Sequence, residues 1–309
     1  INGRILVTGA NGFVGANLCE YLISKDISVR RSQRRKVDAH DSIIIDLDDR
    51  DADWCQALED CESVVHLASR VHVLNENLDE PLVAFRKTNV EGTLNLARQA
   101  LTNNIKRFIF ISSIGVNGAE TLGTPYNQSD VAAPHSPYAI SKYEAELALR
   151  AVFEGSGVEL IIIRAPAIYG LNAPGNFGLV EKFIKKGLPL PFASIKNKRS
   201  LLALDNLVDL IFVCLCHPAA SNHTFLASDG YDLSTPEIIA VMGTLVGKSP
   251  KLGVMPPALL KILFTMVKKR QAGQSLLGDL QIDSSNMFEL LDWRPPFNPL
   301  SLLEKMNKR

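Results

Sequence analysis

Ser113, Tyr138 and Lys142 are the residues whose types and spacing most clearly suggest chemistry. Tyr138 and Lys142 are four positions apart, so on a helix they lie on one face. An ammonium close to a phenol favours the phenolate and lowers the tyrosine pKa from its ordinary value of about 10. A tyrosine altered in this way can act as a general acid or base, and the Ser113 hydroxyl would hold the same substrate oxygen.

The neighbouring residues predict the element that positions this pair. Ser136 and Pro137 are typical of the N-cap and first turn of a helix, so Tyr138 and Lys142 should lie near the start of a rigid element. The pair also has an ordinary structural explanation, in which Tyr138 is a half-buried core residue and Lys142 is solvated. The N-terminal sequence favours the chemical explanation.

A glycine-rich turn follows the first expected strand, 4–8, and precedes a helix expected from about residue 13 to residue 25. Gly9, Gly12 and Gly15 permit a tight turn, close approach of backbone N–H groups to a pyrophosphate, and close packing of helix on strand. The helix N-terminus then presents partial positive charge to the phosphates. This order predicts a dinucleotide site, against the alternative of an ordinary turn between strand and helix.

The second expected strand, 27–31, ends among basic residues and has no acid at its end. In NAD-specific sites an Asp or Glu near this point binds the ribose hydroxyls. Arg31 and Arg34 instead suit a 2′-phosphate, because guanidinium groups make charge-assisted hydrogen bonds to it. The pattern favours NADP(H), with NAD(H) as the alternative cofactor and a solvated basic loop as the structural alternative.

Further strands are expected at 42–45, 63–67, 107–112 and 159–164, separated by helices that include a long one at 82–101. This alternation predicts an α/β fold with a Rossmann-like, doubly wound parallel sheet. Ligands of such sheets bind at the carboxyl ends of the strands. We therefore expect additional cofactor contacts near those ends and from the long helix, at Asn11, Phe13, Val14, Asp46, Leu47, Leu67, Ala68, Ser69, Asn89, Ile111, Ala165 and Pro166.

The second half of the chain predicts a smaller substrate lobe. We expect a helix ending near 187, a basic loop to 199, a strand and helix over 201–216, a strand at 224–227, and helices near 235–246, 257–270, 283–290 and 299–307. Ser234 and Glu237 have the spacing of a capping box. Residues 1–170 with 201–228 should form the dinucleotide-binding domain, and 171–200 with 229–309 the substrate lobe.

Composition and charge exclude several classes of function. The 309 residues are 46% hydrophobic and 21% charged, and 33 basic residues balance 33 acidic ones, so no general affinity for nucleic acid or for an anionic membrane is expected. The five cysteines show no metal-ligand spacing and suit buried thiols in a reducing, cytoplasmic compartment. No signal peptide is visible, and the most apolar run, 258–267, is too short for an integral membrane segment. His66 lies in an apolar run and is expected to be a packed core residue.

The chain resembles the extended short-chain dehydrogenases/reductases, in particular the nucleotide-sugar epimerases, dehydratases and reductases. The glycines at 9, 12 and 15, Ser113, and Tyr138-x-x-x-Lys142 occur in that family's order and spacing. The resemblance implies that Tyr138 transfers a proton, Lys142 binds the ribose and Ser113 orients the substrate. It also implies a homodimer through two long helices, and substrate contacts from Arg70, Asn176, Arg199 and Arg270.

Two departures from the family pattern are informative. The family's 4,6-dehydratases carry an Asp-Glu pair where this chain has Ile114 and Gly115, so the groups for dehydration are missing. The usual Val-Tyr-Gly is here Val-Asn-Gly, with Asn117 at its centre. The segments 66–73 and 85–93 resemble those of 4-reductases of bacterial O-antigen pathways, which act on UDP-2-acetamido-2,6-dideoxy-4-hexulose and form UDP-N-acetylquinovosamine.

Three functional hypotheses follow. The first is an NADPH-dependent reductase of the C4 ketone of a UDP-linked sugar. The second is a UDP-hexose 4-epimerase that retains NAD, which the basic residues after the second strand disfavour. The third is a non-catalytic dinucleotide-binding regulator, which need not keep Ser113, Tyr138 and Lys142 together.

Overall fold

A seven-stranded sheet runs through the larger part of the protein, and every strand pair in it is parallel. The computed structural model describes residues 3–34, 41–71, 81–267 and 270–301, apart from the side chains of 270 and 271. The strand order is β10-β6-β5-β4-β1-β2-β3, which confirms the predicted doubly wound α/β fold. The strands span Arg4–Thr8 (β1), Val29–Gln33 (β2), Ser42–Ile44 (β3), Cys61–His66 (β4), Arg107–Ser113 (β5), Glu159–Ala165 (β6) and Thr224–Leu226 (β10).

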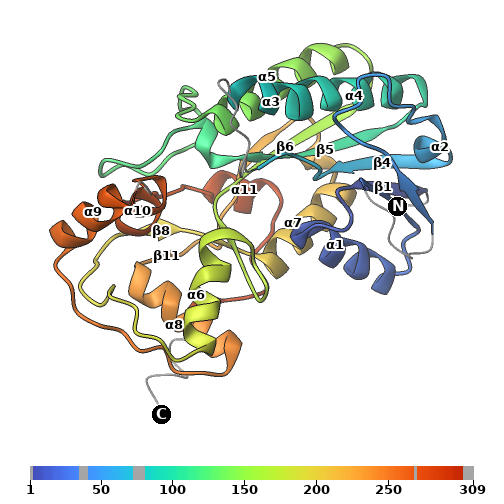
Figure 1. Ribbon diagram of the computed structural model, residues 1–309. Coiled ribbons are helices and arrows are strands. Elements are labelled where there is room, and N and C mark those ends of the chain that lie inside the picture. The colour runs from blue at the N-terminus through green and yellow to red at the C-terminus, as the bar shows by residue number, and fades with distance from the viewer. Residues whose placement is uncertain (1–2, 35–40, 72–80, 268–269, 302–309) are drawn as a thin grey trace.

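Helices cover both faces of this sheet, as Figure 1 shows. On one face lie α1 (Phe13–Ser24) and α7 (Leu204–Cys216); on the other lie α3 (Pro81–Arg86), α4 (Thr93–Thr102) and α5 (Pro137–Phe153). A short helix, α2 (Cys55–Leu58), precedes β4. The central strands are apolar and buried because both of their faces are covered, as parallel sheets require.

β2 begins two residues later than its sequence predicts. Asp26 adopts φ +59°, and the N–H of Ile27 donates to the Leu22 carbonyl at 3.0 Å. These contacts close the end of α1, as in a Schellman motif, so residues 27 and 28 are not available to start the strand. At its other end β2 continues to Gln33, paired with Ile44 of β3, so its carboxyl end lies past Arg31.

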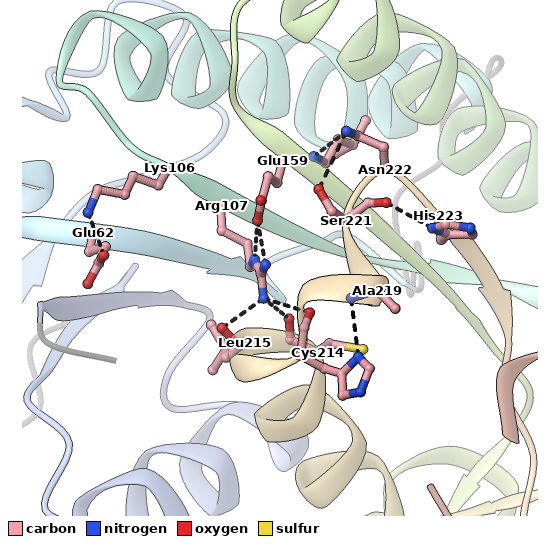
Figure 2. A network of polar contacts seen from close by, with 12 residues as sticks. Glu62, Lys106, Arg107, Glu159, Cys214, Leu215, Ala219, Ser221, Asn222 and His223 are labelled. Carbon is pink, nitrogen blue, oxygen red and sulfur yellow. Dashed lines mark hydrogen bonds and ion pairs between the residues drawn. The ribbon is translucent and has the colours of Figure 1, made fainter. Parts of the chain in front are cut away.

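Arg107, at the start of β5, joins the sheet to the end of α7 (Figure 2). Its Nε donates to the Glu159 carboxylate at 2.6 Å. Its Nη1 donates to the backbone carbonyls of Cys214, Leu215 and His217 at 2.8, 2.9 and 3.2 Å. A cation at this point satisfies the last carbonyls of a helix and its negative dipole end. The buried arginine thus fixes α7 against the sheet.

The smaller lobe has its own apolar cluster, which includes Ile184, Leu190, Leu233, Met242 and Leu260. Its elements are α6 (Gly175–Lys185), α8 (Thr235–Val246), α9 (Pro257–Met266), α10 (Arg270–Leu277), and a two-stranded pair of β8 (Arg199–Ser200) and β11 (Asp232–Leu233). A second pair joins β7 (Ile168–Tyr169) to β9 (Leu202–Ala203). The capping box of α8 is present, with the Ser234 N–H 2.7 Å from the Glu237 carboxylate.

The C-terminal part of the chain differs from expectation in two places. The helix predicted at 257–270 is present as α9, which ends at Met266, and α10 is a further helix that the sequence did not predict. α11 (Ser285–Leu290), within the range predicted for the lobe, brings Met287 into the core beneath the sheet, together with Leu291 and Trp293. Most of the helix predicted at 299–307 lies outside the described residues. Within the described part of the chain, no helix has the length and apolarity needed to cross a bilayer.

Candidate active site

A cavity of about 1080 Å³ lies at the carboxyl ends of the strands and extends into the smaller lobe. Most of the residues expected at the site line it: Gly9, Asn11, Gly12, Phe13, Val14, Gly15, Arg34, Asp46, Leu47, Leu67, Ala68, Ser69, Arg70, Ile111, Ser113, Tyr138, Ala165, Pro166, Asn176 and Arg199. Three expected residues, Arg31, Asn89 and Lys142, are not among its lining residues. The side chain of Arg270 lies outside the described part of the structure.

The glycine turn has the geometry that a dinucleotide pyrophosphate requires. Gly9 adopts φ +66°, and a Cβ there would come within 2.9 Å of the Ala68 nitrogen. A Cβ on Gly15 would lie 2.2 Å from the Gly9 carbonyl oxygen. α1 begins after Gly12 without a side-chain cap, so no side chain competes for its first N–H groups. The turn therefore fits a dinucleotide.

Ser113 is the last residue of β5, and its Oγ accepts a hydrogen bond from the Gly115 N–H at 3.1 Å. This bond uses an oxygen lone pair and leaves the hydroxyl hydrogen to be donated. Ser113 can therefore donate to a substrate oxygen in the cavity while the Gly115 N–H fixes its orientation.

Tyr138 projects into the cavity from the first turn of α5. The predicted helix start is confirmed, since the Ser136 Oγ accepts from the Ala139 N–H at 3.2 Å. Burial raises the pKa of Tyr138 to about 12, although a hydrogen bond with the Ser69 side chain opposes this shift. The expected lowering of the Tyr138 pKa by Lys142 is thus wrong, because burial raises this pKa and the opposing contact comes from Ser69. The phenol is protonated at neutral pH and is available as a proton donor.

Lys142 is 2% exposed, and its Nζ lies 3.8 Å from the centre of the Phe110 ring. Burial lowers its pKa to about 7, against the opposing influence of Glu146. The same ring stacks on His66. The pKa of His66 is lowered to about 3 by burial and by the charge of Lys142. The two ring nitrogens of His66 are hydrogen-bonded to the hydroxyls of Thr8 and Thr93, so His66 is the packed core residue that the sequence predicted.

Glu146 continues the face of α5 that carries Tyr138 and Lys142, and it is 1% exposed. Arg164 of β6 binds it in a bidentate manner, with Nη2 to Oε2 at 2.7 Å and Nε to Oε1 at 3.0 Å. Ser112, next to Ser113, donates to Glu146 at 2.5 Å. Arg164 also donates to Asn117 at 2.9 Å. This network fixes α5 relative to β5 and β6, and hence Tyr138 relative to Ser113; sequence analysis did not identify it.

Asn89 lies behind the cavity wall. The long predicted helix is interrupted by a π-helical segment, Lys87–Gly92, which contains this asparagine. The Asn89 side chain accepts from the Arg70 N–H at 2.8 Å and donates to the Arg70 carbonyl and the Ser141 hydroxyl, each at 3.0 Å. π-segments are frequent at functional sites. Asn89 therefore positions the loop after β4 against α5.

The extension of β2 changes the predicted set of basic residues. Ser32, Gln33 and Arg34 line the cavity at the carboxyl end of β2. Arg31 lies within the strand, and its side chain is hydrogen-bonded to Cys19 of α1. Among the predicted pair, only Arg34 is therefore placed to meet a group at this end of the cavity.

Arg70 lines the cavity near β3 and interacts with an aspartate. Its Nη2 lies 2.9 Å from the Asp48 carboxylate, and its Nε donates to Thr88 at 3.2 Å. Burial alone would raise the pKa of Asp48, but the hydrogen bonds from Thr88 and Arg70 hold it below its ordinary value. This end of the cavity is opposite the smaller lobe, where Asn176 and Arg199 lie.

Arg199 is largely buried at the lobe end, and its Nη1 donates to the Gly278 carbonyl at 2.9 Å. Burial lowers the pKa of this guanidinium, although Asp279 opposes the effect.

Sequence analysis did not assign several other residues of the lining to the site, namely Ser32, Gln33, Asp48, Thr88, His135, Thr235 and Ser275. The capping box of α8 predicted that a helix starts next to Thr235. It did not predict that this end of the helix forms part of the cavity wall.

The cavity wall near Ser113 and Tyr138 contains no carboxylate among the described lining residues. Ile114 and Gly115 line the cavity in the short turn after β5, and the lining carboxylates are Asp46 and Asp48. An elimination of water would require an acid and a base close to the reacting carbons. In the described part of the chain, no three acidic, histidine or cysteine residues gather in a possible metal site.

Comparison with known proteins identifies the family. Residues 5–227 match the model of the NAD dependent epimerase/dehydratase family. A protein of Vibrio cholerae named UDP-glucose 4-epimerase is 42% identical over 297 residues, with 94% of this chain and 90% of that protein covered. The N-acetyl-alpha-D-glucosaminyl-diphospho-ditrans,octacis-undecaprenol 4-epimerase of Escherichia coli O157:H7 is 30% identical over 267 residues, covering 83% of this chain and 77% of that protein.

Solved structures agree on the fold. The UDP-N-acetylglucosamine 4-epimerase of Bacillus cereus matches with a TM-score of 0.78 at 21% identity, covering 98% of both chains. A Thermus thermophilus UDP-glucose 4-epimerase solved with NAD matches with a TM-score of 0.75 at 20% identity, covering 96% of this chain and 94% of that one. The family match covers the strands that form the cavity, and the chain therefore belongs to the NAD dependent epimerase/dehydratase family of enzymes.

Proposed function

We propose that the protein reduces the C4 ketone of a UDP-linked hexose with NADPH, in the synthesis of a bacterial surface polysaccharide. The observation that carries this proposal is the geometry of Tyr138 and Ser113, whose side chains line the same cavity, with the Ser113 Oγ fixed by the Gly115 N–H and its hydrogen left to be donated. Reduction of a ketone needs a proton donor at the carbonyl oxygen. Family membership favours an enzyme over a non-catalytic regulator.

The residues of this chain would divide the work as follows. When bound in this cavity, NAD(P)H would supply the hydride for reduction of the ketone. Tyr138 transfers its phenolic proton to the C4 oxygen as negative charge develops there, and takes a replacement proton from solvent. Ser113 donates a hydrogen bond to the same oxygen, and such aimed donors contribute strongly where charge develops. The resemblance assigns the ribose to Lys142, which in this structure lies behind the cavity lining and would have to turn from Phe110 to reach it. Asn176 and Arg199, which line the cavity, would bind the diphosphate of the substrate.

NADP(H) is the proposed cofactor, with NAD(H) as the alternative. Arg34 supports NADP(H), because it lines the cavity beyond β2. The two residues before it, Ser32 and Gln33, also line the cavity, and neither is acidic. Structural relatives that contain NAD support the alternative. The UDP-2-acetamido-2,6-dideoxy-4-hexulose substrate rests on the sequence resemblance. A cytoplasmic location and a homodimer also stay predictions.

UDP-hexose 4-epimerisation is the second candidate. The name of the Vibrio cholerae relative favours it, and Ser113 and Tyr138 could serve it through oxidation followed by reduction at C4. Such an enzyme would retain its NAD between the two steps.

The two candidates differ in the fate of the hydride. We would incubate the protein with the 4-keto sugar nucleotide and NADPH that carries deuterium at the transferred position. Reduction predicts deuterium at C4 of the product, with Tyr138→Phe as the inactive control. A purified protein with tightly bound NAD, which interconverts UDP-hexoses without net cofactor change, would overturn the reductase proposal.

A further inference from the structure

His135 is a polar residue of the cavity wall that has no part in the proposed mechanism. Its side chain is exposed and lines the cavity. The next residue, Ser136, is the N-cap of α5, so the histidine lies directly before the helix that presents Tyr138 to the cavity. The same helix start therefore holds His135 close to the reacting groups.

A hydrogen bond to the backbone fixes the tautomer of the His135 ring. Nδ1 lies 3.2 Å from the Gly115 carbonyl oxygen. A carbonyl oxygen only accepts, so Nδ1 carries the hydrogen of this bond. In the neutral ring Nε2 then has a lone pair and no hydrogen, and within the described part of the chain no residue hydrogen-bonds to it. His135 therefore offers an unused acceptor to a ligand in the cavity.

The His135 ring also lies next to the Ser113 hydroxyl. A Cβ on Gly115 would stand 3.2 Å from Ser113 Oγ and 3.3 Å from His135 Cε1, which is the ring carbon bonded to both nitrogens. The two side chains thus approach the same point from separate elements, β5 and the segment before α5. A sugar whose C4 oxygen is bound by Ser113 therefore brings the substituents of its neighbouring carbons close to His135.

The chemistry of the proposed substrate leaves one partner for this acceptor. Ring carbons C3 and C5 adjoin C4. In a 2-acetamido-2,6-dideoxy-4-hexulose, C5 carries a methyl group, which cannot donate a hydrogen bond, whereas C3 carries a hydroxyl. The acetamido N–H at C2 is one carbon farther from the ketone. The C3 hydroxyl is thus the only donor next to the reacting carbon.

We propose that His135 Nε2 accepts a hydrogen bond from the C3 hydroxyl of the sugar, and that His135 is thereby a residue of substrate recognition. The inference rests on the proposed function, because it takes the C4 oxygen as the group that Ser113 and Tyr138 bind. With the oxygens on C3 and C4 both held, the sugar presents one face of its ketone. A site that hydrogen-bonds a substrate hydroxyl also rejects an analogue without it, since the protein's polar group is left unpaired.

A purely structural role for His135 predicts different behaviour from its variants. The Nδ1 bond to Gly115 ties the segment before α5 to the turn after β5. If His135 served only as this tie, an amide that keeps the donor would suffice. His135→Asn retains an N–H near Nδ1 but has no acceptor that reaches as far as Nε2, whereas His135→Gln places its amide oxygen near the position of Nε2. The two variants therefore separate the backbone bond from the substrate contact.

Equilibrium binding tests this contact without turnover. UDP-N-acetylquinovosamine, the expected product, would be titrated calorimetrically into the full chain with NADPH present; both compounds are reduced, so no reaction follows. His135→Asn should bind it roughly three- to tenfold more weakly than wild type, which corresponds to the loss of one hydrogen bond, while His135→Gln should recover most of that affinity. The 3-deoxy analogue should bind wild type and His135→Asn equally, because it lacks the hydroxyl.

UDP, which has no hexose, is the control ligand and should bind wild type and both variants alike. Three results would overturn the role of His135: a His135→Asn variant that binds the UDP-sugar as well as wild type or better than His135→Gln, an equal loss for UDP and the UDP-sugar, or a full loss that persists with the 3-deoxy analogue. Wild type that binds no UDP-sugar would overturn it together with the proposed function. The expected binding pattern in a protein that does not oxidise NADPH with the 4-keto sugar would instead overturn the reductase and leave the contact with the C3 hydroxyl in place.

Discussion

Lys142 lies with its Nζ 3.8 Å from the centre of the Phe110 ring, beneath the helix that presents Tyr138 to the cavity. The loss of water around the buried ammonium disfavours its charge, although the face of the aromatic ring attracts a cation. Burial consequently brings the Lys142 pKa down to about 7 and raises that of Tyr138 to about 12. Of the two groups, Tyr138 is the one that firmly holds its proton at neutral pH.

Replacement of Tyr138 by phenylalanine should leave cofactor binding intact and remove most of the turnover. The lost group is a proton donor, and general acid catalysis contributes roughly a hundredfold to ten-thousandfold. Cofactor titration by fluorescence and steady-state kinetics would measure the two effects separately. A variant with near-normal turnover would contradict the assigned role.

Lys142 should make the stability of the protein depend on pH above neutrality. Between the folded pKa of about 7 and the unfolded value of 10.5, the unfolded chain binds a proton that the folded chain lacks. Stability should therefore rise with pH across this window. Lys142→Met should flatten the rise in denaturant titrations, whereas Lys25→Met, at an exposed position just after α1, should not. An unchanged slope in Lys142→Met would show that the lysine is not desolvated.

Glu146→Gln should be far more damaging than Glu144→Gln, although both acids lie on α5 and each binds an arginine in a bidentate manner. The Glu146–Arg164 pair is buried, and removal of one charge from such a pair costs about 3–5 kcal/mol. The Glu144–Arg86 pair is largely exposed and should be worth about 1 kcal/mol or less. Thermal or urea unfolding would measure the difference.

The same Glu146→Gln variant should reduce kcat more than it raises KM, because the network positions Ser113 and Tyr138 and does not touch the substrate. Equal stability losses in Glu146→Gln and Glu144→Gln would contradict the structural account. A rise in KM alone would contradict the positioning role.

Arg34→Glu should weaken NADPH binding by roughly ten- to a hundredfold and affect NADH much less, since it removes a charge-assisted contact to the 2′-phosphate. Arg31→Gln is the comparison, because Arg31 does not line the cavity. Dissociation constants for both nucleotides would be measured by fluorescence. Equal losses for NADPH and NADH would remove the support that Arg34 gives to NADP(H).

Local sequence determined much of the fold in advance. The strand before Gly9, the glycine turn, and the start of α5 at Ser136 depend on neighbouring residues, so spacing and capping chemistry are sufficient to predict them. The order of the strands at the cavity follows from the alternation of strands and helices. These features account for the correct prediction of the cavity's location.

The remaining features depend on contacts between distant residues. The exception is the two-residue shift of β2, which follows from the local closing contact between Ile27 and Leu22. The interruption of the long helix is associated with the bonds of Asn89 to the Arg70 backbone and Ser141. The environment of Lys142 depends on Phe110 of another strand. Sequence spacing indicates that such residues share a face, but it does not indicate what covers that face.

The most direct test of the central claim is the change in nicotinamide absorbance when the protein is mixed with NADPH and UDP-2-acetamido-2,6-dideoxy-4-hexulose. The account predicts loss of NADPH in a one-to-one ratio with the ketone consumed, and no such loss with Tyr138→Phe. Unchanged absorbance from wild-type protein that demonstrably binds NADPH would contradict the proposed reaction.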